Sequence, residues 1–183
     1  MRGGGGGRRA PKGRDCDYGN RTDMKIGIIS DTHGLLRAEV FEVFAGVEHI
    51  LHAGDVGPSE ILTELEAIAP VTAVWGNTDG FDLRKSVPEV AHVELGGVPV
   101  VVLHGMQLGS PTPEKAAGAY GGAGLVVFGH SHRPVIRQVG ATLAVNPGSA
   151  GPVRFRDPVT VALAEIGEGR VAARLVELDP KRK

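Results

Sequence analysis

The sequence predicts an α/β protein whose first half alternates strands and helices and whose second half is rich in strands. Three observations carry this prediction. Short apolar runs with many β-branched residues recur between glycine, proline, asparagine and aspartate residues. Apolar positions with helical spacing lie between the first three of these runs. From residue 98 onward, most runs follow one another through short, hairpin-like connections such as "EIGEGR".

Nine apolar runs are predicted as strands from their length and β-branched content. They are 25–29, 49–53, 71–75, 98–103, 124–128, 134–139, 141–145, 159–166 and 170–178. Helices are predicted at 35–45 and at 58–69, with Pro58 suited to a first helical turn. A third helix is predicted at 112–120, where Thr112 would cap the helix and Pro113 would take its first position.

Residues 1–23 form a segment of different composition from the rest of the chain. They are rich in glycine, arginine and aspartate and have almost no apolar side chains, so we expect a disordered N-terminal extension. Two roles fit it, a nucleic-acid-binding arm and an upstream extension without function. "MKIGIISDTHG" begins with Met24 and enters a strand at once, which favours the second role. We therefore expect one folded domain over residues 24–183, which is long enough to bury a core.

Charge and cysteine content restrict the partners and the compartment. The net charge is −1, with +3 in residues 1–23 and −4 in the remainder, which gives no general case for nucleic acid or membrane binding. A single cysteine, Cys16, precludes a disulfide within the chain and fits a reducing compartment. No secretory signal and no apolar run near the ~20 residues of a membrane helix is present. We therefore expect a cytoplasmic protein without a membrane partner.

Polar residues with glycine beside them follow six of the predicted strands. They are Asp31-Thr32-His33, Asp55, Asn77, His104, His130 with His132, and Asn146-Pro147-Gly148-Ser149. In α/β sheets ligands bind beyond the carboxyl ends of the strands, so these groups are expected to converge. Carboxylates, imidazoles and an amide without thiolates suit Mn²⁺, Fe²⁺, Ni²⁺ or Zn²⁺. Each motif alone also fits a plain turn or a helix cap, but the ordered set favours a metal centre.

The number of candidate ligands predicts two ions rather than one. The seven residues Asp31, His33, Asp55, Asn77, His104, His130 and His132 exceed what one ion needs. Two ions that share a bridging carboxylate would use them all. Such a pair can hold a bridging hydroxide and stabilise a phosphoryl group during in-line displacement.

The motifs "DTHG", "AGDV", "GNTD", "LHG" and "GHSH" together resemble the ordered signature of the calcineurin-like metallophosphoesterases. The short length and "NPGS" resemble the small YfcE-type phosphodiesterase branch, which also includes the retromer scaffold subunit. The resemblance covers about residues 24–178. It implies a four-layer α/β/β/α sandwich of two packed mixed β-sheets. It also implies one metal held by Asp31, His33, Asp55 and His132, and another held by Asp55, Asn77, His104 and His130, with Asp55 bridging.

The sequence departs from this family at one position. Many members have a histidine after the Gly-Asn pair, and it acts as general acid near the leaving group. This chain has Thr78 there, and a threonine hydroxyl is a poor acid near neutral pH. Either water protonates the leaving group, or the preferred substrates have leaving groups that depart with little assistance from an acid. Two other residues have alternatives. Asp79 either orients His104 or a metal-bound water, or is a turn residue, and Arg133 either binds substrate phosphate or is solvated.

The prediction is a metal-dependent phosphodiesterase in which a bridging hydroxide attacks phosphorus. Asp55, Asn77 and His104 are the predicted catalytic residues, because Asp55 bridges the ions and the other two fix the second metal and the transferred oxygens. Two divalent ions per chain are expected, Mn²⁺ first, with Ni²⁺, Fe²⁺ or Zn²⁺ as alternatives. The expected partner is a small phosphate ester, and a homo-oligomer stays open. The alternative is a protein-binding scaffold on the same fold with little catalysis.

Overall fold

The computed structural model describes residues 23–153 and 157–179, which form ten strands and four α-helices. The strands are β1 (Met24–Ile29), β2 (His49–His52), β3 (Val71–Ala73), β4 (Val90–Leu95), β5 (Val98–Leu103), β6 (Leu125–Val127), β7 (Val135–Val139), β8 (Thr142–Asn146), β9 (Thr160–Gly167) and β10 (Arg170–Glu177). The helices are α1 (Ala38–Val43), α2 (Glu60–Glu66), α3 (Phe81–Ser86) and α4 (Pro113–Ala119), with a 3₁₀ turn, η1, at Met106–Leu108.

The strands form two mixed sheets. Sheet A has the order β10-β9-β1-β2-β3, with β1, β2 and β3 parallel and β9 antiparallel to both of its neighbours. Sheet B has the order β4-β5-β6-β8-β7, with β5, β6 and β8 parallel and antiparallel strands at both edges. The parallel strands lie at the centre of sheet B and at one side of sheet A, so their carboxyl ends gather at one end of the molecule.

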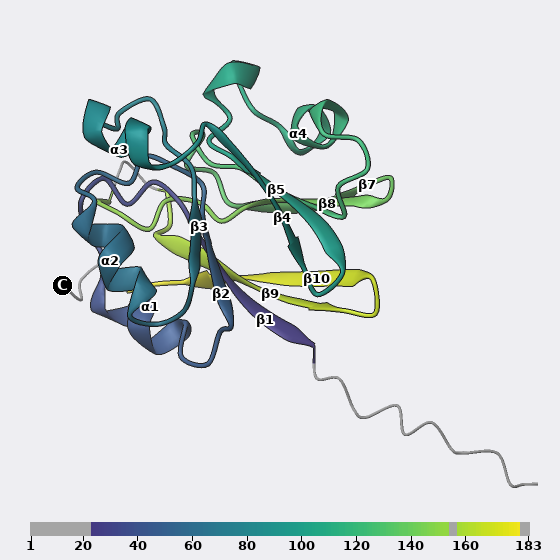
Figure 1. The fold of residues 1–183 in the computed structure, drawn as a ribbon, viewed down its shortest axis with the longest axis horizontal. Helices are drawn as coiled ribbons and strands as arrows, with labels where there is room; N and C mark the ends of the chain where they lie inside the picture. The colour runs from purple at the N-terminus through teal and green to yellow at the C-terminus, as the bar shows by residue number, and fades with distance from the viewer. Residues whose placement is uncertain (1–22, 154–156, 180–183) are drawn as a thin grey trace, which may run out of the picture.

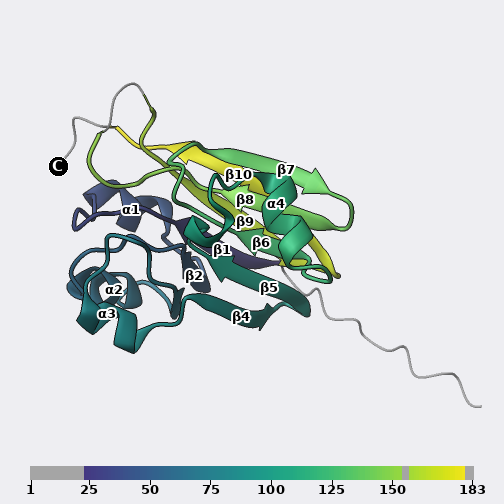
Figure 2. The ribbon, with the colours of Figure 1, turned by 90° about the horizontal axis from the view of Figure 1, so that it is seen from above.

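The two sheets pack face to face and helices cover their outer faces (Figures 1 and 2). One apolar cluster lies between the sheets, a second joins sheet A to α1, α2 and α3, and a third joins sheet B to α4. In β5, the side chains of Val98, Val100 and Val102 enter the first cluster, whereas Val101 and Leu103 enter the third. This alternation is the period of two that a strand buried on both faces requires. The expected four-layer α/β/β/α sandwich is therefore confirmed.

The predicted helices exist but are shorter than expected at both ends. Residues 35–45 shorten to α1 because Arg37 is extended, at φ −81° and ψ 145°. Residues 58–69 shorten to α2, and Pro58 lies outside the helix, where its carbonyl accepts a hydrogen bond from the Ile61 amide. The α4 prediction was accurate, since the Thr112 hydroxyl accepts from the Lys115 amide and Pro113 is the first helical residue.

One α-helix and one strand, α3 and β4, were not predicted, and neither was the η1 turn. In α3 the buried apolar residue is Leu83, so no helical period is visible in the sequence. In β4 a usable signal was present, because the Gly96-Gly97 pair between "VAHVEL" and "VPVVVL" is typical of a two-residue hairpin turn. Of the predicted extension at 1–23, residues 1–22 lie outside the described residues, as do 180–183 of the expected domain. Within the described ranges, none of the helices has the length and apolar character that a membrane crossing needs.

Candidate metal centre

All seven predicted ligands lie together at the carboxyl ends of five parallel strands. Sheet A supplies Asp31 and His33 after β1, Asp55 after β2 and Asn77 after β3. Sheet B supplies His104 after β5, and His130 and His132 after β6. The seven residues therefore lie where the two sheets meet, and neither sheet alone supplies the whole group.

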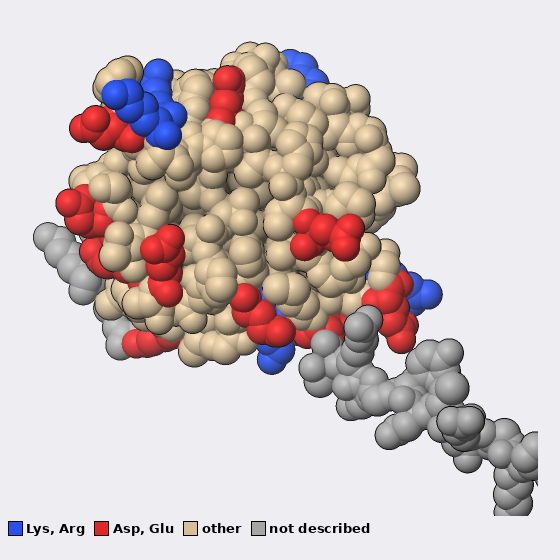
Figure 3. All heavy atoms as spheres, viewed as in Figure 1, with Lys and Arg blue, Asp and Glu red and all other residues tan. Residues whose placement is uncertain are grey.

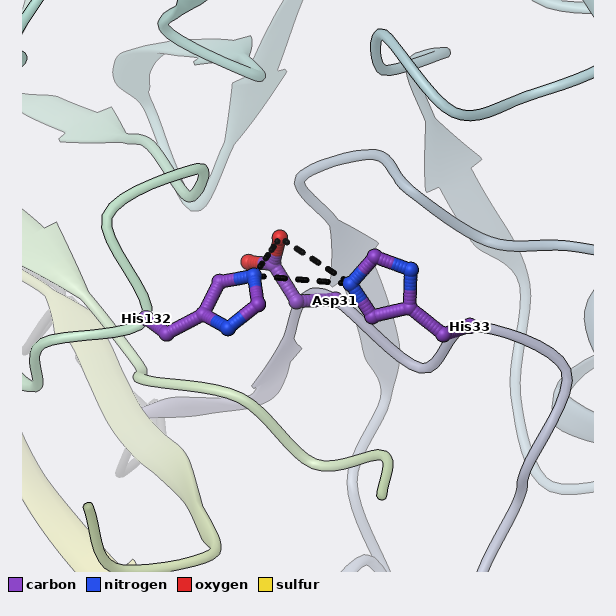
Figure 4. A group of neighbouring side chains, drawn as sticks. All are labelled: Asp31, His33 and His132. Carbon is purple, nitrogen blue, oxygen red and sulfur yellow. Dashed lines mark hydrogen bonds and ion pairs between the residues drawn. The ribbon is translucent and has the colours of Figure 1, made fainter. Parts of the chain in front are cut away.

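Asp31, His33 and His132 form the first group of candidate ligands. Figure 4 shows the two imidazole rings pointing toward each other with the Asp31 carboxylate between them. His132 Nε2 lies 3.1 Å from Asp31 Oδ1, His33 Nε2 lies 4.0 Å from the same oxygen, and the two Nε2 atoms are 3.4 Å apart. Asp31 is fully buried, yet its Oδ1 accepts no hydrogen bond from the part of the chain that is described. Ligand atoms around one ion have separations of this size.

Asp31, Asp55 and His104 form the second group of candidate ligands, and Asn77 and His130 lie beside His104. His104 Nε2 lies 3.4 Å from Asp55 Oδ2, 3.1 Å from Asn77 Oδ1 and 3.2 Å from His130 Nδ1. The opposite ring nitrogen, Nδ1 of His104, lies 2.8 Å from the Ala53 carbonyl and can donate to it. That bond leaves the lone pair on Nε2, which is the tautomer that a metal ligand needs.

The Asp55 carboxylate belongs to the second group and also lies near His33 of the first, and Asp31 belongs to both groups. Its Oδ2 is 3.4 Å from His104 Nε2 in the second group and 3.9 Å from His33 Nε2 in the first. Its Oδ1 accepts a hydrogen bond of 2.9 Å from the Thr78 amide. This bond fixes the carboxylate and leaves Oδ2 facing both imidazoles.

Five of the seven residues have an unusual backbone conformation. Among the described residues, six that are not glycine have positive φ, and five of them are Asp31 (55°), His33 (46°), Asp55 (51°), His130 (67°) and His132 (57°). A left-handed conformation costs a side-chain-bearing residue about 1–2 kcal/mol. Such residues cluster where a functional geometry is imposed. The strain therefore marks these positions as more than turn residues.

Glycines let the ligand loops approach one another closely. A Cβ built at Gly76 would overlap the Asp55 carboxylate, and one at Gly129 would overlap the Ser30 hydroxyl and the Asp31 carboxylate. Any larger residue at either position would push a carboxylate away from the centre. A steric requirement thus explains the glycine that precedes a candidate ligand in "GNTD" and in "GHSH".

Several polar side chains hold the ligand loops in place. Asp79 accepts hydrogen bonds of 2.8 Å from both the Gly57 and the Gly76 amides, so it joins two loops. The fully buried His52 accepts from the Gly54 amide at 3.2 Å, and its Nε2 lies 3.0 Å from Thr32 Oγ1. These residues position the candidate ligands and lie outside the predicted set.

Sequence reasoning missed three contributors. Ser30 donates from its hydroxyl to Asp31 Oδ2 at 2.6 Å, and no sequence signal sets this serine apart. Arg84 of α3 donates to the carbonyls of Asp79 at 2.7 Å and Asn77 at 2.9 Å. Asn146 was among the polar groups expected to converge, but its support of the "GHSH" loop was not predicted: its amide donates to the Gly129 carbonyl and the Ser131 hydroxyl, both at 3.0 Å.

The electrostatic environment favours a charged Asp55. Burial raises the pKa of Asp55, but the bond with the His104 ring, the charge of that ring and the Thr78 amide outweigh burial and hold the pKa well below its usual range. Burial lowers the pKa of His104, yet its bond with Asp55 and the charges of Asp31 and Asp55 raise the pKa above the usual value. Burial and the neighbouring His104 lower the pKa of His130. A cation is thus favoured beside Asp55.

The centre opens into a hollow of about 410 Å³, here named the site hollow. Its lining comprises His33, Asp55, Asn77, Thr78, His130, Ser131, His132, Arg133 and Asp157. Asp31 and His104 are fully buried beneath it. Carboxylate, amide and imidazole donors that point at shared centres fit one or two divalent cations, and the orphaned Asp31 oxygen is a position that a cation would satisfy.

Comparison with known proteins agrees with this geometry. The calcineurin-like phosphoesterase superfamily domain matches residues 24–169. A probable metallophosphoesterase of Methanothermobacter thermautotrophicus is 39% identical over 152 residues, which cover 79% of this chain and 88% of that protein. Phosphodiesterase YfcE of Escherichia coli K12 is 29% identical over 165 residues, which cover 78% of this chain and 88% of that protein.

A solved structure shares the fold. Wild-type Vps29 of Entamoeba histolytica, complexed with Zn²⁺, has 22% identity and a TM-score of 0.67 over 85% of this chain and 100% of that chain. This likeness supports the architecture, and the family match over residues 24–169 with the 39% identical relative supports the kinship. The chain belongs to the calcineurin-like phosphoesterase superfamily.

Proposed function

We propose that this chain is a metal-dependent phosphodiesterase that holds two divalent ions. One ion would be held by Asp31, His33, Asp55 and His132, and the other by Asp55, Asn77, His104 and His130. The observation that carries this proposal is the place of Asp55, whose Oδ2 lies 3.9 Å from His33 in one group and 3.4 Å from His104 in the other. A carboxylate shared in this way keeps two cations close together.

The bound ions would supply Lewis acidity, lowering the pKa of a water shared as the bridging hydroxide and neutralising charge on the phosphoryl oxygens. The protein's own residues supply position. Asp55 would bridge the two groups, fixed by the Thr78 amide. Asn77 and His104 would hold the second group beside the phosphoryl oxygens, and the His104 ring is oriented by the Ala53 carbonyl.

No strong acid stands at the position of Thr78. Its hydroxyl lies 3.4 Å from His33 Nδ1 at the wall of the site hollow. A hydroxyl there can donate a hydrogen bond but cannot release a proton near neutral pH. This wall therefore suits substrates whose leaving groups depart without an acid, or a reaction in which water protonates the leaving group.

We propose Mn²⁺ as the native ion, with Ni²⁺, Fe²⁺ or Zn²⁺ as alternatives. Nitrogen and oxygen donors without thiolates support this set. The proposed substrate is a small phosphate ester in the cytoplasm. The face in Figure 3 has many acidic side chains along its lower part and few basic ones, which does not favour a nucleic acid there.

The protein-binding scaffold is the rival proposal. Likeness to Vps29 at 22% identity concerns the fold alone and does not favour it. The presence of all seven candidate ligands favours the enzyme, because a scaffold does not need a strained set of metal-binding side chains.

Metal analysis with Asp55→Asn tests the proposal. Saturation with Mn²⁺ and removal of free metal should leave two ions per wild-type chain. Asp55→Asn should lose metal from both groups and lower hydrolysis of an activated diester by orders of magnitude, with the fold intact by circular dichroism. The matched control is Asp82→Asn on the exposed side of α3. One ion or fewer in the wild type would sink the two-ion proposal, and full metal and rate in Asp55→Asn would remove the bridge.

A further inference from the structure

A second hollow adjoins the site hollow and is not used by the proposed reaction. This side hollow has a volume of about 520 Å³ and is bounded by residues 109–113, Phe128 and Val135. It shares the lining residues His130, Ser131 and Arg133 with the site hollow. The segment that carries two predicted ligands is therefore the boundary between the two spaces.

Hydrogen bonds and close packing hold the outer wall of the side hollow in place. Lys115 of α4 donates from Nζ to the Ser110 carbonyl at 2.9 Å, and its amide donates to the Thr112 hydroxyl at 3.3 Å. Pro111 is buried, and it packs so closely on Gly105 that a Cβ there would lie 3.1 Å from it. Since Gly105 follows His104 directly, this wall keeps a fixed distance from the predicted metal centre.

The lining of the side hollow is mostly uncharged. Pro113 and Val135 are half-buried and offer apolar surface, whereas Pro111 and Phe128 are buried and contribute little exposed area. Ser110 and Thr112 add hydroxyl groups at the outer wall. Uncharged surface with a few polar groups accommodates a flat organic group better than it accommodates a phosphate.

Arg133 is the charged residue at the junction of both hollows. Within residues 23–153 and 157–179, its guanidinium makes no hydrogen bond or ion pair, and the bond of 3.5 Å to Ser131 uses its backbone amide. A guanidinium is matched in shape to two phosphate oxygens. A phosphate at this junction would face Arg133 while its substituents extend in two directions.

We infer that the substrate is a phosphodiester whose retained substituent is a flat, mainly apolar group that lies in the side hollow. This inference rests on the proposed function. The leaving group would lie in the site hollow toward Thr78, with the phosphate beside Arg133. Water adds to phosphorus, the bond from phosphorus to the leaving oxygen breaks, and that oxygen gains the proton. The product is a phosphate monoester that keeps the flat group.

Three esters with one leaving group test this inference. Phosphate, methyl phosphate and phenyl phosphate esters of p-nitrophenol release the same chromophore but differ in the retained group. Ser110→Trp would fill the side hollow from its outer wall. We expect it to lower kcat/KM for the phenyl diester, relative to the methyl diester, by about tenfold or more, as expected when an apolar group loses its pocket. Thr63→Trp at an exposed position of α2 is the matched control and should leave the ratio unchanged.

A second variant keeps the test decisive if Ser110→Trp does not fold. Val135→Phe fills the same hollow from β7 and should lower the same ratio. If either variant folds, by its melting curve, and leaves the ratio of phenyl to methyl diester unchanged, the inference is overturned. An equal loss for all three esters also overturns it. If the Mn²⁺-loaded wild type hydrolyses none of the three, the proposed function itself fails, which is a separate result.

Discussion

His52 illustrates how a residue outside the predicted ligand set shapes the candidate metal centre. Its Nδ1 accepts a hydrogen bond from the Gly54 amide, so Nε2 carries the proton and donates to Thr32 Oγ1. The Thr32 hydroxyl in turn donates to the Val56 carbonyl at 2.9 Å. The chain of bonds joins the loop of Asp31 to the loop of Asp55, and it requires a neutral ring.

Acid should therefore destabilise the fold through His52. Burial is the main cause that lowers the pKa of His52 to about 4, from 6.5. As the pH falls below 6.5 the unfolded chain takes up a proton that the folded chain refuses until about pH 4, so stability falls across this window. The loss is about 2 kcal/mol at pH 5 relative to pH 7.5. Urea unfolding in a chelator measures it.

The variant His52→Gln removes this titration and should flatten the dependence of stability on pH. His92→Gln, at an exposed position on β4, is the control and should keep the wild-type dependence. An unchanged dependence in His52→Gln would show that other groups are responsible.

Thr78→His tests whether this position faces the leaving group. A histidine there could donate a proton, so hydrolysis of an alkyl ester should rise relative to a nitrophenyl ester. A well-placed acid contributes about 10²–10⁴-fold, and an unsupported ring should reach the lower end or less. The readout is the ratio of the two rates, with Thr63→His on α2 as control. An unchanged ratio means that Thr78 is remote from the leaving group or that protonation does not limit the rate.

At the scale of elements, α3 acts as a support for the "GNTD" loop. Arg84 donates to the carbonyls of Asp79 and Asn77, and its guanidinium lies 4.6 Å from the centre of the Trp75 ring. Because Asn77 is a predicted ligand, this short helix connects directly to the second group of ligands.

Arg84→Ala should therefore weaken both the fold and the binding of Mn²⁺. The loss of one cation–π contact and of the carbonyl bonds should cost about 1 kcal/mol, since the side chain is exposed. Calorimetric titration with Mn²⁺ and urea unfolding measure the two effects. Lys85→Ala removes a cation that lies over the exposed Phe81 ring and should change neither. Equal metal binding in Arg84→Ala and Lys85→Ala would contradict a supporting role for α3.

The strands were predictable from the sequence to a greater extent than the helices. Buried strands such as β5 show an unbroken apolar run, whereas α1 and α3 are six residues each and have too few turns to display a period. The candidate ligands could be chosen from the sequence because each follows a predicted strand and has a side chain that can bind a metal ion. Ser30 and Arg84 could not, because they act through backbone groups and through contacts that depend on the folded loops.

At the scale of the whole molecule, the candidate centre joins the two sheets. Sheet A contributes four predicted ligands and sheet B contributes three. The apolar cluster between the sheets resists their separation, but it has no directional contacts. An ion held from both sides would add a directional link at the open end of the sandwich.

Mn²⁺ should therefore raise the melting temperature. An ion at 100 times its dissociation constant stabilises a protein by about 2.7 kcal/mol. In a chain of this size that corresponds to a rise of about 5–10 °C. Differential scanning calorimetry with and without chelator measures the rise, and Asp55→Asn should lose most of it. A full rise in Asp55→Asn would mean that Mn²⁺ binds elsewhere.

The left-handed backbone at Asp31, His33, Asp55, His130 and His132 also has an evolutionary consequence. Each of these residues stores about 1 kcal/mol or more that glycine at the same position would not. A change of one of them to glycine would relieve this backbone strain, so selection for folding alone would not favour this set of residues. We therefore expect the candidate centre to provide a benefit that outweighs the cost of this strain.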